Sequence, residues 1–260
     1  MERPALKKAL GQHHLRAGAL CRPLVEYLAP RGRRVVEIGA GGGVLTAALV
    51  AAGARVTAWE LDPAWAFRAA RRFAAEPAAR FVVGDALDLP WERIPAPALV
   101  AGNLPYNVAT ALIDRLLAHG DRVERAAFLV QLEVARRLVA EPGSKAYGAL
   151  TVLTAARAAA RLLGRVRPGS FDPPPKVESA FVGLEPRPGP VAAAQAEALR
   201  VLVHAGFGQR RKTLLNALSA RWPRPRVAAA IRAAGLPAGV RAERLSLAQF
   251  AALLKPLGPV

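Results

Sequence analysis

The stretch Ala98–Leu117 reads ALVAGNLPYNVATALIDRLL and contains a strand, a loop and a helix in direct succession. The apolar run Ala98–Ala101 has the length and composition of a short buried strand. After the loop, apolar residues recur at helical spacing, at Val108, Leu112, Ile113, Leu116 and Leu117. Open α/β sheets bind ligands at the carboxyl ends of their strands, so the loop Asn103–Asn107 occupies a position typical of a binding site.

The same alternation of strand and helix continues on both sides of this stretch. Because each helix separates two strands, the pattern predicts an α/β fold with a doubly wound, mostly parallel sheet. The predicted strands are Arg34–Ile38, Arg55–Glu60, Arg80–Val83, Ala98–Ala101, Ala126–Val130 and Ser179–Leu184, and the predicted helices include 18–29, 44–52, 63–75 and 145–163.

A Pro/Gly cluster at 186–190 indicates a domain boundary. We therefore expect a catalytic domain at 1–185 and a small helical domain at 186–260. Predicted helices of the second domain are 191–206, 209–220, 226–234 and 246–254.

The formal net charge of +18 favours a polyanionic partner. Residues 186–260 carry twelve Lys/Arg and only two Asp/Glu. Arg210, Arg211 and Lys212 form the densest run, and we interpret it as RNA-binding, with a solvated helical face as the alternative.

Other classes of protein are disfavoured by composition. The single cysteine, Cys21, excludes an intrachain disulfide, and the four histidines lack paired ligand spacing, so no metal site is expected. Neither a signal peptide nor a long uninterrupted apolar run is present, so a cytoplasmic protein without a membrane partner is expected.

The loop Asn103–Asn107 suits chemistry on the exocyclic amine of adenine. The Asn103 amide oxygen and the Leu104 carbonyl, turned outward by Pro105, could each accept one amine hydrogen and so aim the nitrogen lone pair at a methyl donor. Tyr106 could stack on the base, a contact worth roughly 1–3 kcal/mol. The alternative is an ordinary strand-to-helix turn containing Asn and Pro.

A glycine-rich turn, Gly39–Gly43, follows the first strong strand. Glycine permits a tight turn and close approach of a ligand to the backbone. Glu60 ends the next strand, at a spacing that suits a carboxylate binding both hydroxyls of a ribose. Asp85 follows the third strand and could accept a hydrogen bond from an adenine amine, although a loop-capping role is also compatible with its position.

Two cofactors fit a glycine-rich turn followed by an acidic residue, namely a nicotinamide dinucleotide and S-adenosylmethionine. The spacing Gly-x-Gly-x-Gly differs from the dinucleotide pattern Gly-x-Gly-x-x-Gly. The Asn-Leu-Pro-Tyr loop has a role in methyl transfer and none that we can name in hydride transfer. S-adenosylmethionine is therefore favoured.

Taken together, these motifs make the chain resemble the KsgA (RsmA) family of small-subunit rRNA adenine dimethyltransferases, which are related to the Erm enzymes. The resemblance covers nearly the whole length, and Leu104 with the Gln-Arg-Arg-Lys run favours KsgA over Erm. The matching stretches are Gly11–Leu15, Glu37–Gly43, Glu60, Gly84–Ala86, Asn103–Asn107, Phe171–Ser179, Phe207–Thr213 and Arg241–Ser246.

The resemblance implies a seven-stranded, Rossmann-like class I methyltransferase fold. It also implies dimethylation of two adjacent adenines near the 3′ end of 16S rRNA in the small ribosomal subunit, a step linked to subunit maturation. Residues implied as cofactor contacts are Gln12, His13, Leu15, Gly39, Gly41, Glu60, Leu61, Asp85, Ala86 and Asn103, and those implied around the target base are Asn103, Leu104, Pro105, Tyr106 and Phe171.

Three positions depart from the family pattern. The chain has Gln12-His13-His14-Leu15 where the family usually has Gln-Asn-Phe-Leu, and Ala109 stands where Ser is common. Phe171 has two interpretations, as a residue that stacks on the target adenine, which we favour, or as a core residue.

Two alternatives to the main function remain open. The chain could be an assembly factor that binds immature small subunits with little turnover, or an Erm-like enzyme that acts on 23S rRNA. A monomer is expected.

Overall fold

The computed structural model describes residue 4 and residues 13–209 and 211–258. The chain forms two compact units. The first comprises Met1–Ala135 and Ala160–Pro186, and the second comprises Arg136–Ala159 and Arg187–Val260. The boundary at 186 coincides with the one expected from the Pro/Gly cluster. The segment 136–159, which was expected in the first domain, belongs to the second unit.

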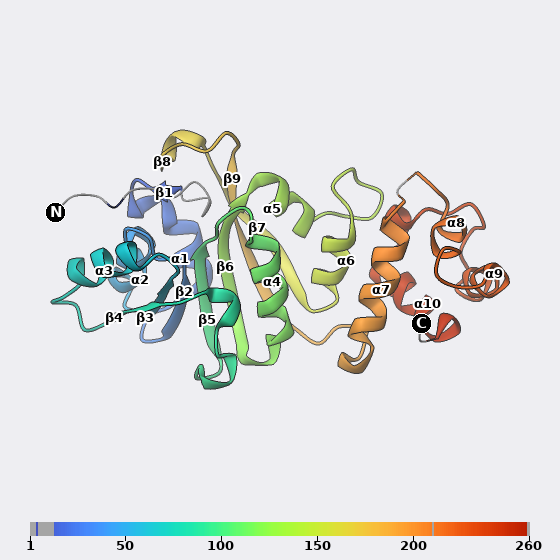
Figure 1. Ribbon diagram of the computed structural model, residues 1–260, viewed down its shortest axis with the longest axis horizontal. Coiled ribbons are helices and arrows are strands. Elements are labelled where there is room, and N and C mark those ends of the chain that lie inside the picture. Colours follow the sequence, from blue (N-terminus) through green and yellow to red (C-terminus); the bar gives the residue numbers. More distant parts are fainter. Residues whose placement is uncertain (1–3, 5–12, 210, 259–260) are drawn as a thin grey trace. The chain divides into compact units, whose positions relative to one another are not determined.

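A seven-stranded sheet, with strand order β4-β3-β2-β5-β6-β9-β7, forms the centre of the first unit (Figure 1). Strands β2 to β6 pair in parallel, and β9 pairs antiparallel with β6. The strands are β2 (Arg34–Ile38), β3 (Arg55–Glu60), β4 (Ala79–Val83), β5 (Ala98–Asn103), β6 (Val123–Gln131), β7 (Ala158–Val166) and β9 (Ser179–Pro186). The predicted doubly wound, mostly parallel fold is confirmed.

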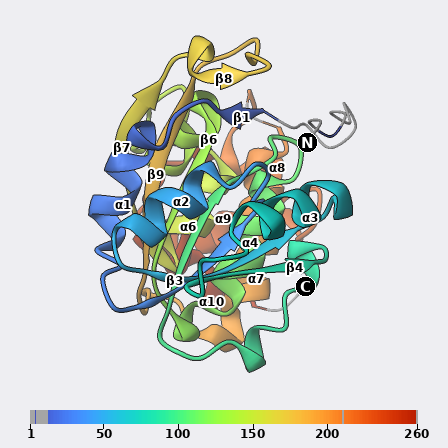
Figure 2. The same ribbon diagram turned by 90° about the vertical axis from the view of Figure 1, so that its left-hand side faces the viewer.

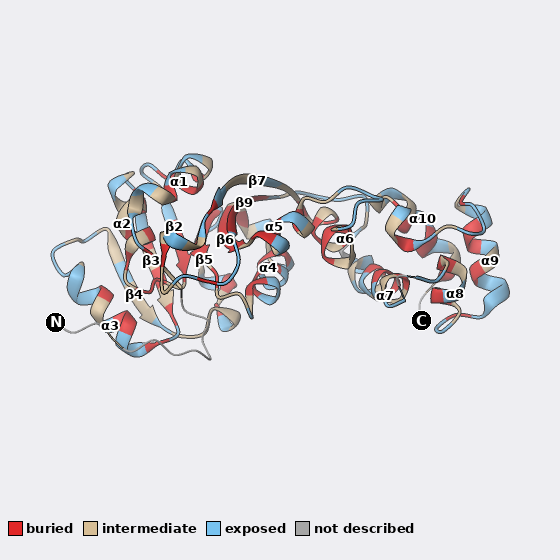
Figure 3. Ribbon diagram, turned by 90° about the horizontal axis from the view of Figure 1, so that it is seen from above, coloured by how far each residue is buried: buried red, intermediate tan, exposed pale blue. Residues whose placement is uncertain are grey.

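Helices cover both faces of this sheet because its strands are apolar on both sides. Leu99 and Ala101 of β5 pack into one cluster with helices α1 and α2, and Leu24 and Leu49 are fully buried there. Helix α4 lies on the other side of the sheet in Figure 3. The helices of this unit are α1 (Arg22–Leu28), α2 (Val44–Ala51), α3 (Pro63–Arg72), α4 (Ala109–Ala118) and the first part of α5 (Leu132–Leu138).

Cys21 is completely buried in the cluster beneath α1 and α2. Burial raises the pKa of its thiol to about 12, so the group is a neutral thiol at pH 7. Cys21 is therefore a residue of the core.

The helix predicted at 145–163 is wrong over its second half. The structure has α6 (Ala149–Ala155) followed by β7, which lies beside β9 at the edge of the sheet. The segment is rich in Ala, Leu and Arg, which favour helix, but propensity is a weak preference that pairing with a neighbouring strand overrides.

Near its start, the described chain forms one strand of a two-stranded antiparallel ribbon. Strand β1 (His14–Leu15) pairs antiparallel with β8 (Phe171–Asp172), and the two lie side by side in Figure 2. The Arg16 backbone N–H donates to Ser170 O over 2.9 Å and its Nε donates to Phe171 O over 2.9 Å. Short 3₁₀ helices complete the chain: η2 (Gly18–Cys21), η3 (Ala86–Asp88), η4 (Trp91–Arg93), η5 (Gly120–Arg122), η6 (Pro168–Ser170), η7 (Ala193–Gln195) and η8 (Ala242–Arg244).

The second unit is helical, as expected, with its own core around Trp222, Phe250 and Tyr147. Its further helices are α7 (Ala196–Phe207), α8 (Leu214–Leu218), α9 (Arg224–Ala233) and α10 (Leu247–Leu257). The predicted helix 209–220 begins later than expected, because Thr213 accepts from the Asn216 N–H and caps α8. Within the described part of the chain, no helix combines the length and apolar character needed to cross a membrane.

Candidate active site

A pocket lies at the carboxyl ends of β2, β3 and β5, where the sheet geometry predicts a ligand site. Most residues expected to contact cofactor or target base line it together. These are His13, Gly39, Gly41, Glu60, Leu61, Asp85, Ala86, Asn103, Leu104, Pro105 and Tyr106, and the wall also includes His14, Ile38, Asn107, Val108 and Leu112.

The Glu60 carboxylate holds the glycine-rich turn in place. One of its oxygens accepts from the Gly41 N–H over 2.7 Å, and the other accepts from the Asp62 N–H over 2.9 Å. The side chain is only 7% exposed, and this burial raises its pKa while the two backbone donors oppose the rise. A carboxylate offers about four acceptor positions, so the Glu60 side chain keeps acceptor capacity for a ligand.

Gly41 has φ of +50°, and a Cβ atom at this position would overlap the His14 ring. The close approach of the ring and the positive φ both require glycine here. The histidine that replaces the family's usual aromatic residue therefore packs directly on the turn, and it also contacts Trp65 with ring centroids 4.2 Å apart.

Glu37 lies beneath the turn on β2 and is completely buried. It accepts from the Thr46 hydroxyl over 2.6 Å, which ties the start of α2 to β2. Burial raises the pKa of Glu37 to about 8, with a smaller contribution from the nearby Glu60 charge and an opposing one from Thr46. The carboxyl group is therefore largely protonated at neutral pH, and its role here is the hydrogen bond that joins α2 to β2.

Asn103 ends β5, and its Nδ2 donates to the His13 carbonyl over 2.7 Å. Because the amide nitrogen is used in this bond, the amide oxygen is the group left to accept from a ligand. The next residue is also held, since the Leu104 N–H donates to Leu129 O of β6 over 3.0 Å and the Leu104 side chain is buried.

The Tyr106 ring is fixed from two sides. Its hydroxyl forms a 2.5 Å hydrogen bond with the Ser179 hydroxyl, and the His13 ring stacks against it with centroids 5.5 Å apart and planes 27° apart. His13 Nδ1 lies 2.9 Å from Pro173 O, and because a carbonyl only accepts, Nδ1 carries the hydrogen. Sequence reasoning missed Ser179 and Pro173 as supports, although both lie in the matching stretch Phe171–Ser179.

Asp85 caps a loop and also lies in the pocket wall. One carboxylate oxygen accepts from the Leu87 N–H over 2.9 Å and caps η3, which is the loop-capping role. The residue also lines the pocket, where its second oxygen is available to a ligand.

Several expected site residues lie elsewhere. Phe171 is completely buried in the core cluster beside Leu15, so the structure supports the core interpretation and not the favoured base-stacking one. Leu15 is likewise buried, with 5% of its surface exposed. It pairs with Phe171 and does not line the pocket. Gln12 and Arg210 lie outside the described residues. Arg211 and Lys212 are exposed in the second unit.

No cluster of three or more His, Cys, Asp or Glu side chains suited to a metal ion occurs among the residues that the structure describes.

Comparison with known proteins places this geometry in a family. The family model for ribosomal RNA adenine dimethylase matches residues 4–257. A relative from Synechococcus sp. (strain JA-3-3Ab) is 41% identical, covering 96% of this chain and 92% of its own. A relative from Anaeromyxobacter sp. (strain K) is 43% identical, covering 97% and 93%. Both are named ribosomal RNA small subunit methyltransferase A.

Solved structures agree in fold. The 23S rRNA methyltransferase ErmE is similar with a TM-score of 0.74 and 29% identity, covering 94% of this chain and 99% of its own. A dimethyladenosine transferase from Plasmodium falciparum has a TM-score of 0.77 at 23% identity, covering 94% and 96%. With a family model matched over almost its entire length and relatives above 40% identity, this chain belongs to the ribosomal RNA adenine dimethylase family.

Proposed function

We propose that this protein uses S-adenosylmethionine to dimethylate two adjacent adenines near the 3′ end of 16S rRNA in the small ribosomal subunit. The names of the relatives support the small subunit as the target. The observation that carries the proposal is the Asn103 amide, whose nitrogen is bonded to His13 O and whose oxygen is left to accept in the pocket that Glu60 and Gly41 also line.

The residues present fit the cofactor. The remaining acceptor capacity of Glu60 suits the hydroxyls of a ribose, and the glycine backbone at Gly39 and Gly41 lines the same pocket. Leu61, Ala86 and Asp85 would enclose the adenine of the cofactor. When bound, S-adenosylmethionine would supply an electrophilic methyl group.

The loop residues would position the target amine. The Asn103 oxygen and the Leu104 carbonyl accept its two hydrogens, which directs the nitrogen lone pair toward the methyl donor. The Tyr106 ring stacks on the base. The same two acceptors stabilise positive charge as it develops on the amine.

No general base or covalent intermediate is required. Methylation makes the amine nitrogen cationic, and it can lose its proton to water. Asn103–Thr110 contains no Asp, Glu, His or Lys, and the only thiol, Cys21, is buried and protonated. The reaction therefore depends on positioning.

The decisive experiment is a methyl-transfer assay with purified small and large ribosomal subunits. Incorporation of about four methyl groups per small subunit and none into the large subunit is expected. Transfer to the large subunit would support an Erm-like activity, for which the ErmE likeness is the specific observation. Tight binding to small subunits without turnover would instead identify an assembly factor. A monomer in the cytoplasm, where the ribosomal substrate is made, completes the proposal.

Asn103→Ala tests the mechanism. Loss of most turnover is expected in single-turnover kinetics on small subunits, while RNA affinity stays within about twofold, because one acceptor of the amine is removed and no phosphate contact is lost. Asn216→Ala makes the same chemical change in the second unit and serves as the matched control. Near-normal rates for Asn103→Ala would contradict the mechanism.

A further inference from the structure

The first unit has a second cleft, which we call the arginine cleft, lined by Arg16, Arg68, Arg72, Trp65, His14 and Asp172 together with Leu15 and Gly42. Three guanidinium groups face one carboxylate, so the cleft carries excess positive charge. His14 lines both this cleft and the pocket described above. The two sites are therefore separated by the thickness of one side chain.

The arginines reach the cleft from two separate parts of the chain, and backbone carbonyls hold Arg16 and Arg72. Arg16 follows β1 and donates through Nε to Phe171 O over 2.9 Å. Arg72 ends α3 and donates through Nη1 to Gly42 O over 2.6 Å. A guanidinium has five N–H donors, so each of these residues keeps several donors after its backbone bond. The groups are thus positioned in advance for an anion.

Aromatic side chains accompany the charges. The Arg68 guanidinium lies 6.0 Å from the centre of the Trp65 ring, and the Arg71 guanidinium lies 6.0 Å from that of Phe67. Trp65 lines the cleft with Arg68, whereas Phe67 and Arg71 lie outside its lining. The Arg68–Trp65 pair is therefore a cation–π contact within the cleft.

A purely structural explanation covers only part of this arrangement. Basic residues in the last turn of a helix interact favourably with its dipole, which accounts for Arg71 and Arg72 on α3. It does not account for Arg16, which belongs to another segment. The convergence of separate segments on one cleft indicates a ligand.

We propose that the arginine cleft binds the phosphodiester backbone of the substrate RNA beside the target adenines. An adenine that enters the pocket must leave its stack, and the phosphates next to it then need partners on the protein surface. Arginine is suited to this role because its planar fork of donors pairs with two phosphate oxygens at once. The inference rests on the proposed RNA substrate and adds a second contact surface, on the first unit.

Salt-dependent binding tests the proposal. The full-length double variant Arg68→Gln/Arg72→Gln is compared with wild type for binding to purified small subunits between 50 and 200 mM salt. Two lost phosphate contacts should flatten the slope of log affinity against log salt by about 1.4–1.8. Arg34→Gln/Arg55→Gln is the matched control, because both arginines are exposed and lie at the amino ends of β2 and β3, whereas the pocket lies at the carboxyl ends.

Cleavage of the bound RNA by an iron chelate attached to the protein tests the proposal without relying on a change in affinity. Ala64→Cys places a reactive thiol on the face of α3 that carries Arg68, one turn away, and Cys21 is too buried to compete. An iron chelate attached there should cut the RNA within a few nucleotides of the target adenines. The control Ala51→Cys, at the end of α2, should not cut at those positions.

The outcomes separate this inference from the proposed function. If wild type methylates small subunits but the double variant keeps the wild-type salt slope, or loses no more slope than the control, the arginine cleft is not an RNA site. Absence of cleavage from Ala64→Cys near the target adenines overturns it as well. If wild type does not methylate small subunits, yet the slope falls and the cleavage appears, the proposed reaction fails while the RNA site stands.

Discussion

At the scale of single residues, His13 connects three parts of the site. Its carbonyl orients the Asn103 amide, its ring stacks on Tyr106, and its Nδ1 donates to Pro173 O. The resemblance implied a cofactor contact at this position, and His13 lines the pocket. Its ring also supports Tyr106, which is proposed to hold the target base.

The hydrogen bond between Tyr106 and Ser179 adds an expected loss of stability when the tyrosine hydroxyl is removed. From the sequence, Tyr106→Phe should lower turnover only slightly and Tyr106→Ala should lower it severely, because stacking on the base needs only the ring. The hydroxyl, however, satisfies the completely buried Ser179. Tyr106→Phe should therefore cost about 1–3 kcal/mol of unfolding free energy, because a buried polar group loses its partner.

A double-mutant cycle measures this pair. Ser179→Ala alone should also be destabilising, while Tyr106→Phe/Ser179→Ala should recover much of the loss, because two apolar groups then face each other. Chemical denaturation gives the free energies. Additive effects of the two changes would show that the hydrogen bond contributes little.

Glu60 should be needed for cofactor binding. Glu60→Ala removes a charged acceptor and also releases the N–H groups of Gly41 and Asp62, so binding of S-adenosylmethionine should weaken by roughly 1.5–3 kcal/mol. Isothermal calorimetry measures the affinity. Glu92→Ala, which removes an exposed carboxylate of the same unit, is the control. Wild-type affinity in Glu60→Ala would refute the ribose assignment.

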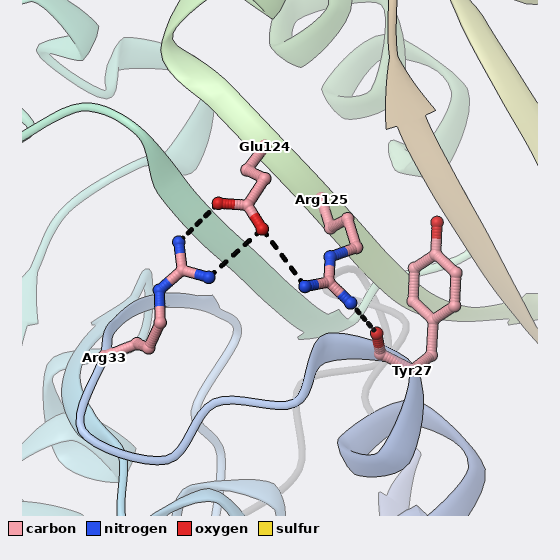
Figure 4. A network of polar contacts seen from close by, with 4 residues as sticks. All are labelled: Tyr27, Arg33, Glu124 and Arg125. Carbon is pink, nitrogen blue, oxygen red and sulfur yellow. Dashed lines mark hydrogen bonds and ion pairs between the residues drawn. The ribbon is translucent and has the colours of Figure 1, made fainter.

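At the scale of elements, an ion-pair network joins segments far apart in sequence (Figure 4). Glu124 of β6 accepts two hydrogen bonds from Arg33, which precedes β2, at 3.1 and 2.5 Å. Arg125 donates to Glu124 over 3.1 Å and to Tyr27 O, near the end of α1, over 2.8 Å. The network fastens α1 and the turn before β2 to the central strand β6.

This network predicts a pH dependence of stability. The Arg33 guanidinium, with help from Arg125, lowers the pKa of Glu124 to about 2, against an ordinary value near 4.5. A carboxylate with a lowered pKa stabilises the fold above the unfolded pKa, and this contribution is lost as the pH falls from about 4.5 to about 2. Because the side chain is 36% exposed, solvent screening limits the contribution to about 0.5–1 kcal/mol.

Glu124→Gln isolates that contribution. At pH 7 the variant should be less stable than wild type by about 0.5–1 kcal/mol, and the difference should shrink below pH 4.5 and vanish near pH 2. Chemical denaturation at a series of pH values measures it. A difference that stays constant down to pH 2 would rule out an electrostatic origin.

At the scale of the whole molecule, charge is divided unevenly along the chain. Residues 186–260 hold twelve of the 37 basic residues but only two of the 19 acidic ones. Charge reversal at Arg210, Arg211 and Lys212 should flatten the slope of log affinity for small subunits against log salt by about 0.7–0.9 per lost phosphate contact. Cofactor affinity, measured in parallel, should stay unchanged. An unaltered slope would show that this run is a solvated surface.

The amino-acid sequence by itself determined the class of fold and most of the pocket. The strand–helix alternation, the glycine-rich turn, Glu60 and the Asn103–Tyr106 loop are local patterns, and periodicity and turn chemistry are encoded within a few neighbouring residues. Parallel strands then bring their carboxyl ends to one edge, which is why residues from three strand ends could be expected together.

Only the tertiary structure decided the rest. The Tyr106–Ser179 bond joins residues 73 positions apart, and the Asn103–His13 bond joins residues 90 positions apart. The burial of Phe171, the strand β7 in a helix-favouring segment and the placement of 136–159 in the second unit likewise depend on distant partners. Local preferences carry no information about such partners, because packing against segments remote in the sequence selects among conformations that propensity leaves nearly equal in energy.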